Sequence, residues 1–140
     1  MPLITFKNGR IYLRVKKRVV RKHRVGMVKH PATEEKRLRV LAKQIVIEKV
    51  GRFNAYYGFE YGKIFIKNQQ TRWGSCSSRK NLNFNYRIAI LPEELQDYLI
   101  VHELCHLKEM NHAKSFWDLV GEQIPNYKIL SKQLRTYSLK

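Results

Sequence analysis

Hydrophobic residues recur at spacings of three and four between residues 33 and 57, which is the pattern of an amphipathic helix. These positions are Leu38, Leu41, Ala42, Ile45, Val46, Lys49 and Phe53, where the lysine stem continues the stripe. Pro31 breaks the chain before them, and Thr33 offers a helix cap, although Lys36 stands where a capping box would have an acidic residue. Gly58 provides the stop signal. We therefore expect a helix that runs to about Tyr57.

Alternation with a period of two predicts strands on both sides of this helix. Before it, Leu3–Phe6 and Ile11–Val15 flank Asn8-Gly9, a dipeptide typical of a type I′ hairpin turn. β-branched residues between charges favour another strand within Lys16–Lys29. After the helix, Lys63–Lys67 and Thr71–Cys76 are predicted as short strands. Residues 83–91 alternate most clearly, so we expect a strand with one face in the core; its polar face holds Asn83, Asn85, Arg87 and Ala89.

Helices are predicted for the last third of the chain. Pro92 can open one, because proline is tolerated at the first helical position and the two acids that follow it suit the positive end of the helix dipole. This helix is expected to reach about Lys108–Met110, with further helices over residues 113–123 and after Pro125. The order ββ-α-βββ-α-α predicts an α+β fold in one domain, residues 1–140.

The composition is that of a globular chain, with 44% hydrophobic and 28% charged residues. No apolar run approaches the roughly 18 residues of a membrane span. Lysine and arginine interrupt residues 1–20 too often for a signal peptide. We therefore expect no membrane partner. Two cysteines cannot build a disulfide scaffold, so we expect a cytoplasmic protein. Cys76 and Cys105 are both expected to be small core residues.

The formal charge of +17 is distributed unevenly. Residues 1–30 contain ten lysines and arginines and no acid, whereas residues 81–140 contain seven residues of each sign. Such a basic front attracts polyanions, nucleic acid first, unless it is only a solvated surface. His23 and His30 lie in this part and are expected at the surface rather than on a metal. The candidate nucleic-acid contacts are Lys16, Lys17, Arg18, Arg21, Lys22 and Arg24.

The helix after Pro92 carries the motif H-E-x-x-H, from His102 to His106. Two histidines four residues apart lie on one helix face, about one turn (~6 Å) apart, so both imidazoles can bind one zinc ion. Glu103 projects ~100° round from His102, beside the metal and not onto it. There its carboxylate can accept a proton from water that the metal activates, and can pass the proton to a leaving amine.

A third histidine, His112, follows six residues after His106. In a continuing helix it would stand ~9 Å further along the axis and ~240° round, so the helix must end between Leu107 and Asn111 if His112 is to share the metal. Asn111 suits a left-handed helix end and the N-cap of a next helix, whose first turn would hold His112. His112 is therefore our expected third ligand, with water in the fourth position. The alternatives are a longer helix with His112 on its surface, or a carboxylate ligand from Glu122 or Asp118.

Several ordered blocks within residues 71–117 resemble the YgjP-like metallopeptidase family and, more distantly, the SprT-like zincins. The blocks are Thr71-Arg72-Trp73-Gly74-Ser75-Cys76-Ser77-Ser78, Asn85-Tyr86-Arg87, Leu91-Pro92, Asp97-Tyr98, His102-Glu103-Leu104-Cys105-His106-Leu107, Asn111-His112 and Phe116-Trp117. The resemblance implies that the three histidines bind zinc, that Glu103 is the catalytic acid/base, and that a mixed sheet packs on the active-site helix in a compact zincin-like fold. The histidine spacing equals that of metzincins, but Glu109 stands where those enzymes have glycine.

Substrate contacts are predicted less sharply. Zincins bind an extended peptide along a strand, so Asn83, Asn85 and Arg87 could face the substrate cleft; otherwise they form a wet or structural face of an ordinary sheet. Residues 72–76 could brace the site from a neighbouring strand. Tyr127 and Tyr137 are the candidates for stabilising the oxyanion, a task that zinc could also serve alone.

These observations favour a peptidase with one zinc ion that acts on peptide or protein substrates, with recruitment to nucleic acid as an addition. The competing class is a non-catalytic nucleic-acid-binding module, in which a fourth protein ligand would close a structural zinc site. A zinc nuclease is less favoured, because such sites commonly use clustered metals.

Overall fold

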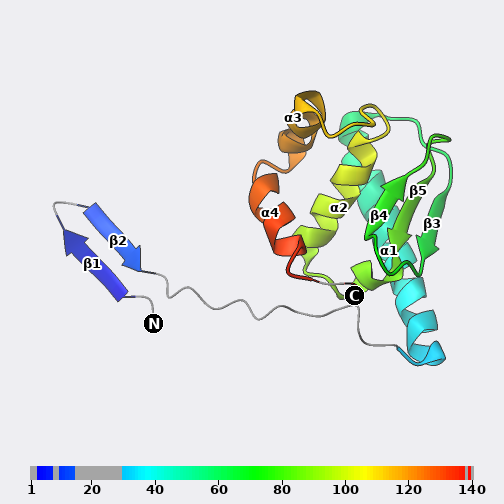
Figure 1. Ribbon diagram of the computed structural model, residues 1–140, viewed down its shortest axis with the longest axis horizontal. Helices are drawn as coiled ribbons and strands as arrows, with labels where there is room; N and C mark the ends of the chain where they lie inside the picture. Colours follow the sequence, from blue (N-terminus) through cyan, green and yellow to red (C-terminus); the bar gives the residue numbers. More distant parts are fainter. Residues whose placement is uncertain (1–2, 8–9, 15–29, 138, 140) are drawn as a thin grey trace.

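The computed structural model describes residues 3–7, 10–14, 30–137 and 139 (Figure 1). β1 (Leu3–Lys7) and β2 (Arg10–Arg14) pair antiparallel with Lys7 opposite Arg10, which confirms the two predicted hairpin strands. Several predictions lie outside the described residues: the Asn8-Gly9 turn, the strand within Lys16–Lys29, His23 and the six candidate nucleic-acid contacts.

Helix α1 (Ala32–Tyr57) ends as predicted but begins differently. Gly58 adopts φ 66°, the left-handed conformation that glycine tolerates best, and its N–H bonds to the carbonyl of Asn54. The predicted cap at Thr33 is wrong, because Pro31 precedes the first turn and no side chain caps it. Two acids in that turn instead suit the positive end of the helix dipole. The buried stripe consists of Leu38, Ala42, Val46, Lys49 and Val50.

The sheet has the order β3-β5-β4, formed by β3 (Ile64–Lys67), β5 (Leu82–Asn85) and β4 (Gly74–Cys76). β3 runs parallel to β5, and β4 runs antiparallel to it. β5 is therefore the central strand, and all of its residues are buried, on both faces.

The strand predicted over residues 83–91 ends at Asn85, where a 3-10 helix, η1 (Tyr86–Ile90), takes over. The side chain of Asn85 accounts for this correction, because its Oδ1 accepts a hydrogen bond of 3.0 Å from the backbone N–H of Arg87. Such a local bond offers the backbone an alternative to the strand ladder.

Helix α2 (Glu93–Cys105) lies at the centre of the fold. It packs against α1, β4, α3 (Lys114–Gln123) and α4 (Tyr127–Leu134). Figure 1 shows it between the sheet and the pair α3 and α4. The architecture is thus the predicted α+β arrangement, with a mixed sheet beside the motif-bearing helix. None of the helices in the described part of the chain has both the length and the apolar character needed to cross a membrane.

A cluster of charges around the buried Lys49 joins α1 to the first turns of α2. Lys49 is only 4% exposed, and its Nζ lies 2.6 Å from Asp97 and 3.3 Å from Glu93. Arg52 also reaches Asp97, at 3.1 Å. A buried ammonium group is tolerated only when it is paired, so these contacts fix how the two helices meet.

Candidate metal centre and active site

Three imidazoles meet where α2 ends. The Nε2 atom of His106 lies 3.2 Å from that of His102 and 3.1 Å from that of His112, and the latter two are 3.2 Å apart. His102 and His106 face the same way because they are one helical turn apart. The structure thus brings together the three histidines that the sequence singled out.

The chain reaches His112 by a different path from the expected one. α2 ends at Cys105, and the N–H groups of Leu107 and Lys108 bond three residues back, which tightens the last turn. Asn111 does not supply the turn, because Lys80 is the one non-glycine residue with positive φ in the described part of the chain. Ala113 is the N-cap of α3, so His112 lies just before that helix and not in its first turn.

The donor set fits a zinc ion. Tetrahedral zinc with Zn–N bonds of 2.0–2.1 Å requires its nitrogen ligands about 3.4 Å apart, close to the distances between these Nε2 atoms. Metal binding also needs neutral imidazoles, and burial, helped by His106 and His112, lowers the pKa of His102 to about 3. Burial likewise lowers the pKa of His106. Both histidines therefore remain neutral at physiological pH.

Hydrogen bonds orient the two histidines on α2. Nδ1 of His106 donates to the carbonyl of Glu109 at 3.0 Å, which leaves Nε2 as the lone-pair donor. Nδ1 of His102 lies 3.3 Å from the hydroxyl of Tyr98. Among the described residues, no other histidine, cysteine or carboxylate joins this group. The alternative ligands are engaged elsewhere, Glu122 with the Tyr56 hydroxyl at 3.4 Å and Asp118 with Lys114 at 4.0 Å.

An aromatic platform supports the histidines. Phe116 is fully buried, stacks on His106 at 4.4 Å, and meets His102 and His112 edge-on at 5.0 Å. Trp117 stacks on His112 at 5.8 Å and on Tyr127 at 5.1 Å. Sequence reasoning missed this role of Phe116 and Trp117, and their spacing of four and five residues after His112 is the signal that could have found it.

Glu103 lies beside the three histidines as a buried carboxyl group with one oxygen that accepts no hydrogen bond. It is 5% exposed, and its Oε2 atom has no hydrogen-bond partner. Burial raises the pKa of this carboxyl to about 8, against the opposing charge of Arg72. Gly74 of β4 lies against it, because a Cβ atom there would come within 3.1 Å of Glu103 Oε1. The strand can approach the carboxylate this closely only without a side chain.

A pocket of about 270 Å³ opens over these groups. It confirms that residues 72–76 border the site, although Trp73 does not line it, and it adds Met110 from the connection before α3. Its lining residues are Arg72, Gly74, Ser75, Cys76, His102, Glu103, His106, Met110 and His112.

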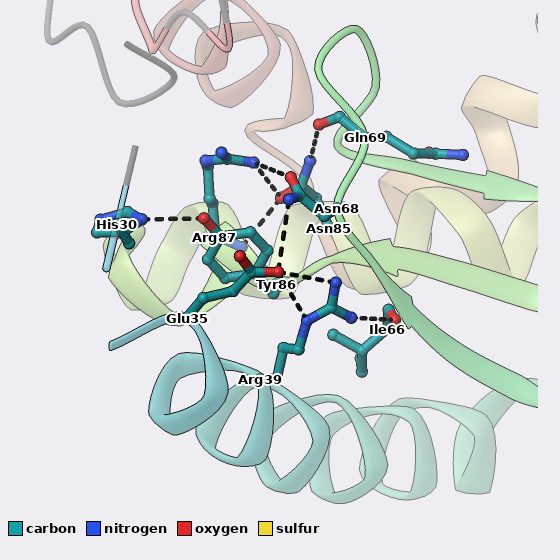
Figure 2. A network of polar contacts seen from close by, with 9 residues as sticks. All are labelled: His30, Glu35, Arg39, Ile66, Asn68, Gln69, Asn85, Tyr86 and Arg87. Carbon is teal, nitrogen blue, oxygen red and sulfur yellow. Dashed lines mark hydrogen bonds and ion pairs between the residues drawn. The ribbon is translucent and has the colours of Figure 1, made fainter. Parts of the chain in front are cut away.

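The predicted cleft residues Asn83, Asn85 and Arg87 do not line this pocket, and all three are buried. Asn85 Nδ2 donates to the carbonyls of Gln69 at 2.5 Å and Arg72 at 3.1 Å (Figure 2). Arg87 donates to Asn68 at 3.0 Å and lies over the Tyr86 ring. They therefore belong to the structural alternative, and the strand beside the site is the edge strand β4, not the central β5.

The same network holds His30, which the sequence placed at the surface. Its Nδ1 lies 2.9 Å from the Tyr86 hydroxyl, and the ring is half-buried against that tyrosine (Figure 2). On the other side, Arg39 pairs with Glu35 at 3.0 Å and donates to the carbonyl of Ile66 at 3.0 Å. As expected, His30 is not one of the converging histidines.

The remaining predictions divide. Cys105 is fully buried, as expected, whereas Cys76 is half-buried and lines the pocket, so it is not a simple core residue. Tyr127 is separated from the pocket by Trp117, and Tyr137 does not line it either. Neither tyrosine is placed to stabilise an oxyanion. Arg72, which the sequence reasoning did not single out alone, contributes the one lysine or arginine side chain in the lining.

Comparisons with known proteins agree with this geometry. The fold of about two thirds of the chain resembles that of two solved metallopeptidase zymogens. Abylysin from Pyrococcus abyssi aligns with a TM-score of 0.60 at 23% identity, over 65% of this chain and 92% of its own. Jannalysin from Methanocaldococcus jannaschii aligns with a TM-score of 0.50 at 28% identity, over 66% of this chain and 94% of its own.

Sequence comparison with curated proteins gives no match. The family model of the YgjP-like metallopeptidase domain, however, matches residues 6–137, almost the whole chain. In this chain, the three histidines that meet in the structure have the H-x3-H and later H arrangement typical of zincins. The chain therefore belongs to the YgjP-like metallopeptidase family.

Proposed function

We propose that this protein is a zinc-dependent peptidase with a zincin-like fold, in which Glu103 is the general acid/base. The observation that carries the proposal is the convergence of three Nε2 atoms next to a buried carboxylate oxygen without a partner. A structural zinc site would need a fourth protein ligand, and among the described residues none joins the three histidines. This supports catalysis over the non-catalytic binding module.

His102, His106 and His112 would hold the ion. When bound, zinc supplies a Lewis acid that makes water acidic enough to lose a proton near neutral pH. With the ion bound, its positive charge would lower the raised pKa of Glu103 and favour the ionised carboxylate. Oε2 would then accept that proton as the water oxygen attacks the peptide carbonyl carbon, and deliver it to the leaving amine nitrogen as the C–N bond breaks. Arg72 is the cation available to the negative charge that develops on the carbonyl oxygen.

The substrate would bind as an extended peptide along β4. This strand pairs only with β5 in the described sheet, so its other edge offers unpaired backbone groups. A peptide can add to such an edge through main-chain hydrogen bonds. Gly74 keeps this edge close to Glu103, which would place the peptide bond beside the carboxylate.

The proposal is tested by the pair Glu103→Gln and Glu94→Gln. Glu103→Gln should retain about one zinc per chain and abolish cleavage of an unfolded protein, because the amide cannot accept the proton. Glu94→Gln makes the same change at an exposed position in the first turn of α2, outside the pocket lining, and should keep both metal and activity. His106→Ala should lose the metal. An active Glu103→Gln enzyme contradicts the mechanism.

A second proposal concerns nucleic acid, and it is supported by the ten lysines and arginines without an acid in residues 1–30. Contacts from Lys16, Lys17, Arg18, Arg21, Lys22 and Arg24 would recruit the peptidase to phosphate backbones. Binding should then fall steeply with salt and weaken when these six residues are replaced by glutamine. Salt-insensitive binding contradicts this role.

A further inference from the structure

The balanced charge of the last sixty residues hides a separation in space. Four of their seven basic residues line one groove between α3 and α4, together with only one of their seven acids. Two of the other acids, Glu93 and Asp97, are bound to Lys49 on the side of α2 that faces α1. The chain thus presents a basic groove that its sequence composition does not reveal.

The groove has a volume of about 550 Å³, within the range of ligand-binding clefts. Lys128 and Lys132 of α4 and Arg135, its C-cap residue, follow one another at spacings of four and three, which places them on one helix face. None of these three forms an ion pair within the described residues. The opposite wall comes from α3, where Asp118 is 4.0 Å from Lys114. The lining residues are Lys114, Trp117, Asp118, Tyr127, Lys128, Ser131, Lys132 and Arg135.

This groove adjoins the metal centre through a stack of rings. Trp117 lies in its wall and stacks on His112 at 5.8 Å on the way to the site. Tyr127, also in the wall, stacks on Trp117 at 5.1 Å. These two steps correspond to about three residues of an extended peptide, at ~3.3 Å per residue.

We infer that the groove between α3 and α4 binds acidic side chains of the peptide substrate, about three residues from the bond that is cleaved. This inference rests on the proposed peptidase function and names a substrate class for it. Three basic side chains without acidic partners form a site for carboxylates, and a bound peptide can reach them without leaving the neighbourhood of His112.

A polypeptide suits the groove better than single-stranded nucleic acid. Proteins that bind single strands generally stack the bases on free aromatic faces. Here the Trp117 ring is already stacked on His112 and Tyr127. What the groove offers is charge beside an apolar wall, which matches acidic side chains of a substrate that also contacts the catalytic pocket.

Binding can be measured without turnover. The chain has two tryptophans, so Trp73→Phe leaves Trp117 in the groove wall as the sole tryptophan, whose fluorescence can be excited without exciting tyrosine. Glu103→Gln is expected to prevent cleavage. The probes are two end-blocked decapeptides, one with four consecutive glutamates and one with glutamines in their place, titrated into the full-length zinc-loaded protein. We expect the glutamate peptide to bind about tenfold more tightly at low salt, since each exposed ion pair contributes modestly.

Charge variants then locate the effect. Lys128→Gln with Lys132→Gln should reduce the preference for glutamate about three- to tenfold, whereas Lys128→Arg with Lys132→Arg should keep it. Lys36→Gln with Lys43→Gln removes the same charge from exposed positions of α1 and should leave the preference unchanged. In an otherwise unmodified enzyme, the two glutamine changes should slow cleavage of a glutamate-flanked substrate and spare a neutral one.

The outcomes separate the two ideas. Equal binding of both peptides, or equal losses in the groove and α1 variants, overturns the acidic-substrate inference. So does a single-stranded oligonucleotide of the same charge that binds more tightly and depends on the same lysines, because the groove would then serve nucleic acid. If glutamate-selective binding is seen but no peptide is cleaved by the unmodified enzyme, the proposed peptidase function fails instead, and the inference fails with it as a statement about substrate.

Discussion

Two polar segments lie within twenty-five residues of each other, and only one of them forms the site. In the segment from His102 to His106, the fold leaves polar atoms available: two Nε2 atoms turn toward His112, and Oε2 of Glu103 has no partner. In the segment from Asn83 to Arg87, polar side-chain atoms are engaged in hydrogen bonds within the protein: the Asn85 side chain alone bonds to two carbonyls and to the N–H of Arg87. Availability of polar atoms, more than their presence, distinguishes a reactive segment from a structural one.

Each segment also contains one buried polar atom that has no hydrogen-bond partner, and the surroundings of these two atoms differ. Nε of Arg87 is buried without a hydrogen-bond partner, but its guanidinium lies 4.5 Å from the centre of the Tyr86 ring, whose face attracts a cation. For Glu103, the charge of Arg72 offsets burial only in part, and the pKa of the carboxyl stays far above its ordinary value. A carboxyl with such a shifted pKa is typical of functional sites.

The largest effect is expected when the aromatic side chain that packs against the three histidines is removed. Phe116→Ala should lower the free energy of unfolding by about 3–5 kcal/mol, because it empties a fully buried site. It should also weaken zinc binding roughly tenfold to a hundredfold, since outer contacts orient metal ligands. Urea unfolding and chelator competition measure the two effects. Phe65→Ala makes the same change at a 41% exposed position on β3 and should affect both far less.

Asn85→Ala tests the structural segment and should have a smaller effect. Losing its hydrogen bonds leaves buried backbone groups unsatisfied, which costs about 1–3 kcal/mol. Zinc stoichiometry at saturation should not change, because Asn85 does not line the pocket. Asn126→Ala is the matched control, since that exposed asparagine makes no capping bond to α4. Full stability in the Asn85 variant, or loss of zinc, would contradict the assignment.

The smallest effect is the change with pH in the free energy of unfolding of the metal-free protein, to which Glu103 contributes and Asn85 does not. Burial raises the pKa of Glu103 from 4.5 to about 8, so the folded state binds a proton that the unfolded state lacks, and stability falls as pH rises between these values. The lowered pKa of His102 acts oppositely, so its contribution is lost as pH falls from 6.5 to about 3.

Between pH 6.5 and 8, the contribution of His102 should therefore be constant, and only Glu103 of these two residues should make the stability fall as pH rises. Its slope is at most about 1.4 kcal/mol for each pH unit. Urea unfolding after chelation measures it. Glu103→Gln should remove the slope, whereas Asn85→Ala should lower stability and leave the slope in place, because asparagine does not titrate. An unchanged slope in Glu103→Gln would contradict the buried-carboxyl account.

Much of the fold follows from patterns that local physics determines. The apolar spacing before Gly58 predicted α1 and its end, and the motif H-E-x-x-H placed His102 and His106 on one face of α2. Helix geometry showed that the helix had to end before His112 if that residue was to share the metal, but it did not give the path of the chain in between. These predictions needed no knowledge of distant contacts.

The errors arise where side chains meet across the fold. Alternation in residues 83–91 fitted a strand, but the Asn85 side chain bonds to the backbone and starts η1. Polarity suggested a wet face there, yet loop carbonyls from Gln69 and Arg72 surround Asn85. Which strand borders the site depended on pairing order, and β4 occupies the edge although it precedes β5 in sequence. No local pattern encodes such partners.

The position of His112 ahead of α3 has a consequence for how long the folded enzyme lasts. The three Nε2 atoms come from residues that extend over ten positions, from His102 to His112, so an ion held by all three would join the end of one helix to the beginning of another. A ligand that binds only the folded chain stabilises it according to its free concentration relative to its dissociation constant. The concentration of free metal would thus govern how often the end of α2 and the beginning of α3 separate, and how often other proteases can reach the chain.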